Sequence, residues 1–119
     1  MEITIREEHG LKVAVIQSEL EVITDVQSAL DFIATVAWET GCYHIILNKA
    51  AIIEDLSTRL AGEILQKFTT YEVKVAIVGN FSAYTSKSLQ DFIRESNQGR
   101  QVFFVAHEDE AMEKLGRCM

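Results

Sequence analysis

Hydrophobic and polar residues alternate at the start of the chain and then gather into short apolar runs. Ile3 and Ile5 alternate with polar neighbours, which predicts a strand with one wet face near the edge of a sheet. The turn at 7–10 ends in a glycine that can take a positive φ, so this strand and the next should form a hairpin. The apolar runs, each typical of a strand covered on both faces, are 11–16, 43–47, 73–78 and 102–105.

Between these runs, hydrophobic residues recur at helical spacing. The first helix is predicted to begin at 24–27, with Thr24 as its N-cap, and to stop at Gly41. A short last helix should begin with the acidic residues 108–110, which favour the positive end of the helix dipole. The positions predicted to face the sheet are Val26, Ala29, Leu30, Ile33, Val36 and Ala37, then Leu60, Ala61, Ile64, Leu65, Phe68 and Tyr71, and finally Leu89, Phe92 and Ile93.

This order of elements predicts a single α/β domain over residues 1–119. An N-terminal β-hairpin should lead into a mainly parallel sheet of about five strands, with about four helices. A chain of 119 residues buries roughly two thirds of the surface that its unfolded form exposes. We therefore expect it to fold without a disulfide or a metal.

The net charge and the start of the chain indicate which kinds of partner and which location to expect. The net charge of −7 opposes binding to phosphate backbones, so no nucleic-acid partner is expected. An acidic surface can meet a basic protein surface, and it also simply keeps a protein in solution. The chain has no apolar run of membrane length and no signal-peptide pattern at its start, which predicts a cytoplasmic protein without a membrane partner. Cys42 and Cys118 lack framework spacing and are expected to be reduced thiols.

Two resemblances bear on fold and function. The segments DVQSALD at 25–31, LAGEILQKF at 60–68, KVAIVG at 74–79 and SKSLQDFI at 86–93 resemble an uncharacterised bacterial family, domain of unknown function 4180, which implies no activity. Over nearly the whole chain, the order of elements resembles the STAS domain of anti-sigma-factor antagonists. That resemblance implies a STAS-like fold and a regulatory role through protein binding.

The STAS resemblance also draws attention to Ser57 and Thr58. In the antagonists, the phosphorylated serine or threonine directly follows an aspartate at the start of the helix after the third strand. Here Leu56 stands between Asp55 and Ser57. Ser57 and Thr58 are therefore candidate phosphoacceptors, and either hydroxyl also suits the N-cap of the second helix.

A candidate ligand site follows from the parallel sheet. Loops that leave the carboxyl ends of parallel strands gather at one rim, where helix N-termini point their amides outward. The segment 79–88 could hold an anion there, although it lacks the second glycine of a Walker loop; a turn and N-cap made by Ser82 or Ser86 is the alternative. The predicted ligand-binding residues are Asn48, Asp55, Gly79, Asn80, Ser82, Lys87 and His107.

No catalytic or metal centre is predicted. Cys42 and His44 are placed on one strand face, which could suggest a thiol with its base or a pair of metal ligands. The sequence offers no CxxC or HxxxH pair and no third ligand to complete such a site. We therefore expect no catalytic residue, no metal and no cofactor.

Trp38 is the candidate for a protein contact. Counting 100° per residue places it about a third of a turn from the apolar stripe of the first helix, so partial exposure is expected. Such a ring could anchor an interface, including one between two copies of the chain, or it could cover the end of the core.

Two classes of function follow. We favour a nonenzymatic protein-interaction or regulatory module whose partner is another protein. The alternative is a small-molecule or anion-binding protein, or an enzyme, that uses the rim at the carboxyl ends of the parallel strands.

Overall fold

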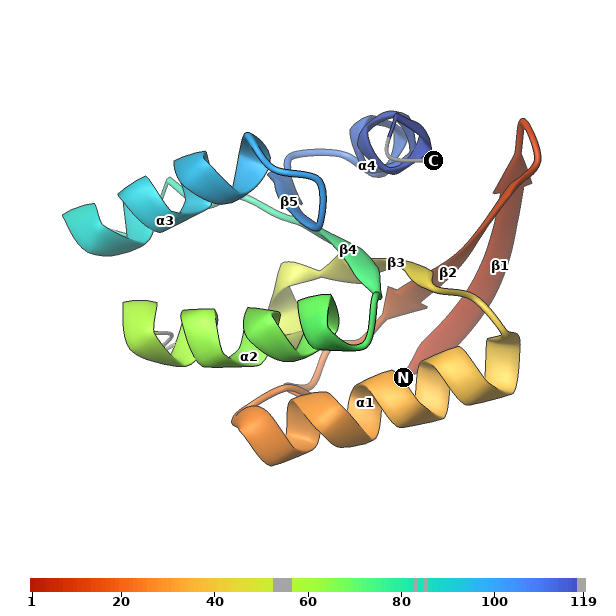
Figure 1. Cartoon of the computed structure of the whole chain (residues 1–119), viewed down its shortest axis with the longest axis horizontal. Helices are drawn as coiled ribbons and strands as arrows, with labels where there is room; N and C mark the ends of the chain where they lie inside the picture. The colour runs from red at the N-terminus through yellow and green to blue at the C-terminus, as the bar shows by residue number, and fades with distance from the viewer. Residues whose placement is uncertain (53–56, 83, 85, 118–119) are drawn as a thin grey trace.

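The computed structural model describes residues 1–52, 57–82, 84 and 86–117, and it confirms the predicted α/β fold class. The described part holds one five-stranded sheet in the order β1-β2-β3-β4-β5 (Figure 1). β1 pairs antiparallel with β2, and every later pair of neighbours is parallel. The strands are β1 (Glu2–Glu8), β2 (Leu11–Gln17), β3 (His44–Asn48), β4 (Lys74–Val78) and β5 (Val102–Val105). The helices are α1 (Val26–Thr40), α2 (Thr58–Thr70), α3 (Lys87–Asn97), α4 (Glu108–Gly116) and the single 3-10 turn η1 (Lys49–Ala51).

The helices cover the two faces of the sheet unequally. Each parallel strand lies beside the one before it in the chain, so right-handed crossovers place α1, α2 and α3 on one face. α4 lies on the other face (Figure 1). Ile45 and Leu47 of β3 belong to the larger apolar cluster beneath α1 to α3, whereas Ile46 belongs to the cluster beneath α4. None of the described helices is long and apolar enough to cross a membrane.

The start of α1 differs from the prediction. Asp25, and not Thr24, is the N-cap: its carboxylate accepts from the Ser28 amide at 2.7 Å, and the Ser28 hydroxyl accepts from the Asp25 amide at 3.0 Å. Gln27 does not reach back to the cap but donates to Asp31. A short carboxylate beside the first helical residue completes the capping box one position later than expected. Phe32 of α1 is also buried, although it was not among the positions predicted to face the sheet.

The end of α2 is a second difference. Tyr71 was predicted to lie on the apolar face of this helix, but it follows the last helical residue and is 55% exposed. The Val73 amide donates to the Phe68 carbonyl at 2.8 Å, and the Glu72 amide donates to the Thr69 carbonyl at 3.0 Å. These two bonds form a Schellman motif, in which Glu72 takes the left-handed position with φ 58°. At the end of α1, Gly41 takes the left-handed conformation with φ 69°.

The two edge strands of the sheet, β1 and β5, differ in what lies beside their outer backbone groups. Along β5, the Asn97 side chain accepts from the Phe104 amide at 2.7 Å and donates to the Phe104 carbonyl at 3.2 Å, so it occupies the place of a neighbouring strand. No described strand pairs with the outer edge of β1. Arg6 instead ties β1 to α4 through ion pairs with Glu108 at 2.6 Å and Asp109 at 2.9 Å.

Candidate functional site

The rim at the carboxyl ends of the strands holds Asn48 and Asn80, and the side chains of both bond within the protein. Asn48 ends β3, and its side chain accepts from the Ser18 amide at 2.9 Å and donates to the Ser18 carbonyl at 2.6 Å. Ser18 is buried, so these bonds satisfy backbone groups that water does not reach. Asn48 therefore links the chain after β2 to the end of β3.

Lys49, directly after β3, contacts the chain that follows β4. Its ammonium donates to the Asn80 carbonyl at 2.8 Å and lies 4.5 Å from the centroid of the Tyr84 ring. A Cβ on Gly79 would stand 2.5 Å from the Cβ of Lys49, a distance that real Cβ atoms essentially never show. Glycine at position 79 is what allows this close approach. Lys49 was not among the predicted ligand-binding residues, although its position after β3 was a signal for it.

The segment after Gly79 forms a turn and a helix cap. The Asn80 side chain accepts from both the amide and the hydroxyl of Ser82, at 3.0 and 2.6 Å. The Ser86 hydroxyl accepts from the Leu89 amide at 3.3 Å and is the N-cap of α3. This outcome matches the turn-and-cap alternative for 79–88.

The structure brings together only part of the predicted rim site. Asn48, Gly79 and Asn80 line a depression of about 660 Å³, which Glu19, Glu21 and Lys49 also line. Ser82, Lys87 and His107 do not line it. Lys87 and His107 are exposed at the starts of α3 and α4, and the His107 side chain makes no capping bond. Asp55 lies outside the described residues.

Ser57 caps α2. Its hydroxyl accepts from the Leu60 amide at 3.1 Å, while Thr58 is the first residue within the helix. The capping role is thus filled by Ser57 and not by Thr58. Ser57 is exposed, and its role as a phosphoacceptor stays a prediction.

Cys42 and His44 do not share a strand face, contrary to the prediction. β3 begins at His44, and Cys42 is buried in the apolar cluster beneath α1 to α3. His44 has the parity of Ile46 and faces the α4 side. Burial lowers the pKa of His44, and the positive charge of Lys74 lowers it further. The described residues contain no group of three His, Cys, Asp or Glu side chains that could hold a metal ion.

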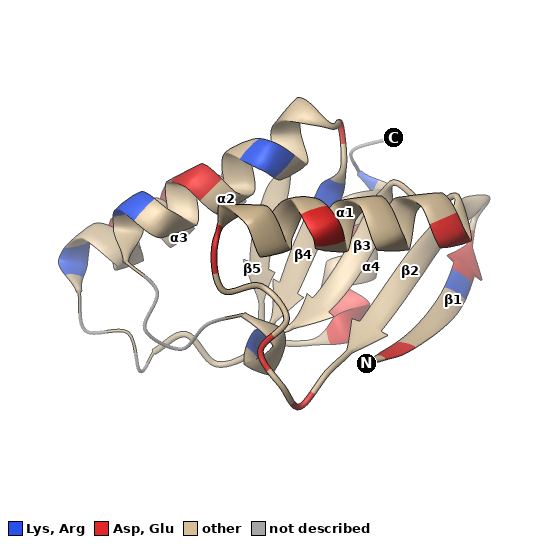
Figure 2. Ribbon diagram, turned by 90° about the horizontal axis from the view of Figure 1, so that it is seen from below, with Lys and Arg blue, Asp and Glu red and all other residues tan. Residues whose placement is uncertain are grey.

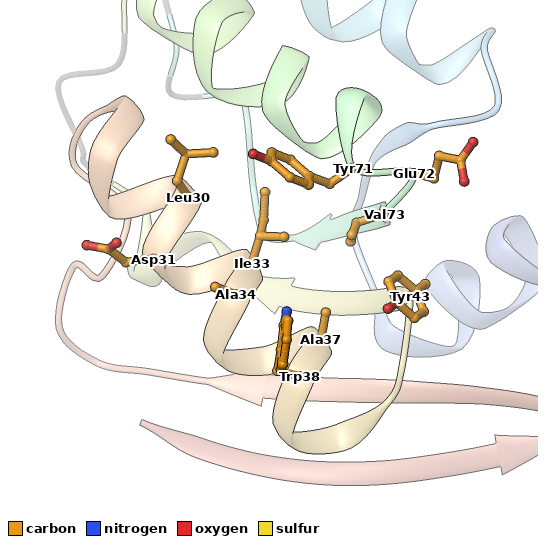
Figure 3. Close-up of a pocket in the computed structure, with 10 residues that line it drawn as sticks. All are labelled: Leu30, Asp31, Ile33, Ala34, Ala37, Trp38, Tyr43, Tyr71, Glu72 and Val73. Atoms are coloured by element: carbon orange, nitrogen blue, oxygen red, sulfur yellow. The ribbon is translucent and has the colours of Figure 1, made fainter.

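A second concave surface lies at the opposite ends of the parallel strands. It is a groove of about 770 Å³ between α1 and the turn that joins α2 to β4 (Figure 3). Trp38, Tyr43 and Tyr71 line it and are 87%, 52% and 55% exposed. We call this surface the aromatic groove; its lining residues are Leu30, Asp31, Ile33, Ala34, Ala37, Trp38, Tyr43, Tyr71, Glu72 and Val73.

The aromatic groove has apolar walls and acidic ends. Figure 3 shows Asp31 and Glu72 at opposite ends, with their carboxylates turned away from the rings. The ten lining residues include neither Lys nor Arg. α1, which forms one wall, carries Asp31 and Glu39 and no basic residue (Figure 2). Trp38 was predicted to be partly exposed, whereas Tyr43 and Tyr71 were assigned to a strand and to a helix face.

Comparison with known proteins gives a family and a fold, without an activity. Among curated proteins, none matches the chain. The NMR structure of the protein TM1081 is similar, with a TM-score of 0.51 and 17% sequence identity over 98% of this chain and 90% of that one. At this identity, the likeness concerns the fold alone. The sequence model of the family described as Domain of unknown function (DUF4180) matches residues 8–115, so the chain belongs to that family.

Proposed function

We propose that this protein is a nonenzymatic regulatory module of STAS-like fold, which binds another protein through the aromatic groove. The observation that carries the proposal is the exposure of three aromatic side chains, Trp38, Tyr43 and Tyr71, around one concave surface. Exposed Trp and Tyr side chains are enriched among the residues that supply most of the binding energy at protein interfaces.

The packing around Trp38 also supports this proposal. With 87% of its surface in water, the ring covers little of the core, so its contribution to folding is small. Ile33, Ala37 and Val73 are buried and form a fixed apolar floor below the exposed rings. A partner that covers the rings gains apolar burial without first rearranging the core.

Small-molecule binding at the rim is the second candidate, and the depression of about 660 Å³ favours it. The amide of Asn48 is bonded to Ser18, and the Lys49 ammonium is bonded to the carbonyl of Asn80. A ligand would have to compete with these bonds, which places this function second.

Photocrosslinking in the native cell tests the proposed function. A photoreactive amino acid replaces Ala34, which is exposed in the groove, or Ser88, which is exposed on α3 and serves as the control. We expect crosslinked protein at position 34 that disappears when Trp38→Ala is added, and none at position 88. Equal crosslinking at both positions, or no effect of Trp38→Ala, would contradict the proposal.

A further inference from the structure

We infer that the segment held by the aromatic groove is a basic peptide stretch of another protein, with an apolar anchor flanked by Lys or Arg. This inference rests on the proposed function and adds the chemistry of the partner. Three features of the groove support it: the apolar residues at its floor, the acidic residues at its ends and the backbone conformation of Glu72.

The apolar residues at the floor of the groove favour an occupant with apolar side chains. Ile33, Ala37 and Val73 are at most 5% exposed and present hydrocarbon to the groove. In the described part of the chain, neither the Trp38 indole nor the Tyr71 hydroxyl makes a hydrogen bond within the protein. The occupant must therefore bring apolar side chains for the centre, and it can accept hydrogen bonds at the margin.

The negative charges at the two ends of the groove favour Lys or Arg on both sides of the apolar anchor. Asp31 and Glu72 stand at opposite ends of the groove, and no lining residue is basic. A guanidinium or ammonium group can pair with either carboxylate, and another such group of the same segment can lie over the face of the Trp38 or Tyr71 ring. A second copy of the chain would bring its own charge of −7 to this surface, so like charges oppose it as the occupant.

The backbone at Glu72 is an independent sign. A residue other than glycine in the left-handed region costs stability, and Glu72 holds that conformation at the edge of the groove. Glycine would end α2 without this cost, as it ends α1 at Gly41. The Glu72 carboxylate therefore stands at this edge at a cost to the fold, which Glu72→Gly can measure.

A displayed library of random 16-residue peptides tests the inference while the partner itself is still unidentified. Selection is carried out on the native chain and on Asp31→Asn/Glu72→Gln, which keeps the shape of the groove and removes two charges. Glu2→Gln/Glu95→Gln removes two exposed charges elsewhere and is the matched control. Groove binders are those whose binding disappears with Trp38→Ala. Because Trp38 is the single tryptophan of the chain, its fluorescence reports directly whether a peptide covers the groove.

We expect groove binders to be enriched in Lys and Arg beside apolar residues. Their affinity should fall about three- to tenfold in Asp31→Asn/Glu72→Gln and with added salt, but not in the control. Groove binders without an excess of basic residues, with equal affinity for all three proteins, would overturn the basic partner and leave the proposed function standing. Failure to select any groove binder, together with no crosslink at position 34, would overturn both. A dimer that buries Trp38 would also overturn the inference, because it would identify a second copy as the occupant.

Discussion

The two ends of the parallel strands carry different side chains and use them differently. At the carboxyl ends, Asn48, Lys49 and Asn80 bond to other groups of the protein. At the amino ends of β3 and β4, Trp38 and Tyr71 leave more than half of their surface in water. A cluster of polar residues thus need not be a ligand site, because its hydrogen-bonding groups can bond to other groups of the protein. Exposed aromatic rings gain little from the fold, and for this reason we propose their surface as the binding site.

The largest expected effect comes from Asn48→Ala, which tests whether the rim is structural. The change removes two hydrogen bonds and leaves the amide and carbonyl of buried Ser18 without their partner. We expect the free energy of unfolding, measured with denaturant, to fall by about 2 to 4 kcal/mol. His107→Ala, at an exposed rim position, is the control and should change it by less than about 0.5 kcal/mol. Equal effects of the two changes would mean that the Asn48 bonds do not stabilise the fold.

Trp38→Ala tests the other end of the strands. We expect the free energy of binding to the crosslinked partner, or to a selected peptide, to weaken by about 2 kcal/mol or more. The stability should change by less than about 0.5 kcal/mol, because 87% of the side chain is exposed. Calorimetry gives the first quantity, and denaturant unfolding gives the second.

The same variant decides between a partner and self-association. If two copies meet through α1, sedimentation of the native chain at high micromolar concentration should show a dimer that Trp38→Ala weakens. A monomer under these conditions removes self-association and leaves the aromatic groove to another protein.

Ser57→Ala tests whether the Ser57 hydroxyl is the N-cap of α2 or the phosphoacceptor of a switch. Loss of its bond to the Leu60 amide should reduce stability by about 0.5 to 2 kcal/mol. Ser57→Asp should be tolerated, because aspartate also caps a helix and complements its dipole. Thr58→Ala should cost less than Ser57→Ala, since Thr58 lies within the helix.

A phosphorylation switch gives a different result for the same residue. Ser57→Asp would then abolish partner binding with stability preserved, and phosphopeptide analysis of protein from its own cell would find the modification. Stable alanine variants without any modified residue would contradict both roles.

Glu72→Gly separates the contribution of Glu72 to stability from its contribution to binding. Glycine relieves the left-handed strain, so we expect a gain of about 0.5 to 1 kcal/mol in the free energy of unfolding, together with weaker binding of basic peptides. Gly41→Ala is the converse control: space around Gly41 is open, so its loss of stability would report the cost of the conformation alone. A Glu72→Gly protein that binds basic peptides as tightly as before would mean that the carboxylate is not used.

Lys87→Ala should have the smallest effect. Lys87 is exposed at the start of α3 and does not line the rim depression, so its removal should change stability by less than about 0.5 kcal/mol. Titration of the native chain with inorganic phosphate should give no heat. Heat that decreases with salt and disappears in Lys87→Ala would instead establish an anion site.

The sequence predicted those features that depend on local spacing. The bounds of β5 and the start of α4 are confirmed, and the residues over 102–105 are buried as expected. The count of 100° per residue placed Trp38 correctly outside the apolar stripe of α1. Of the predicted caps, Ser86 is confirmed, but Asp25 takes the place predicted for Thr24.

Features that depend on long-range partners could not be predicted. Asn48, Gly79 and Asn80 lie at the predicted end of the strands, yet nothing in their spacing shows that Asn48 bonds to Ser18, 30 positions earlier. The aromatic groove was missed because helical periodicity extends by one residue past the true end of α2 and assigns Tyr71 to its buried face. The left-handed turn at Glu72 reverses the chain there, and the glycine that usually signals such a turn is missing.

The side chain of Asn97 has a consequence for how these molecules can aggregate. Because it occupies the hydrogen-bonding groups of Phe104, β5 offers no template for another strand at that position. The outer edge of β1 has no described strand beside it, so another strand could extend the sheet there. Molecules that join only through this edge form pairs, with like edge against like edge, and do not add further molecules in sequence. One amide side chain thus hinders edge-to-edge growth on the β5 side of the sheet.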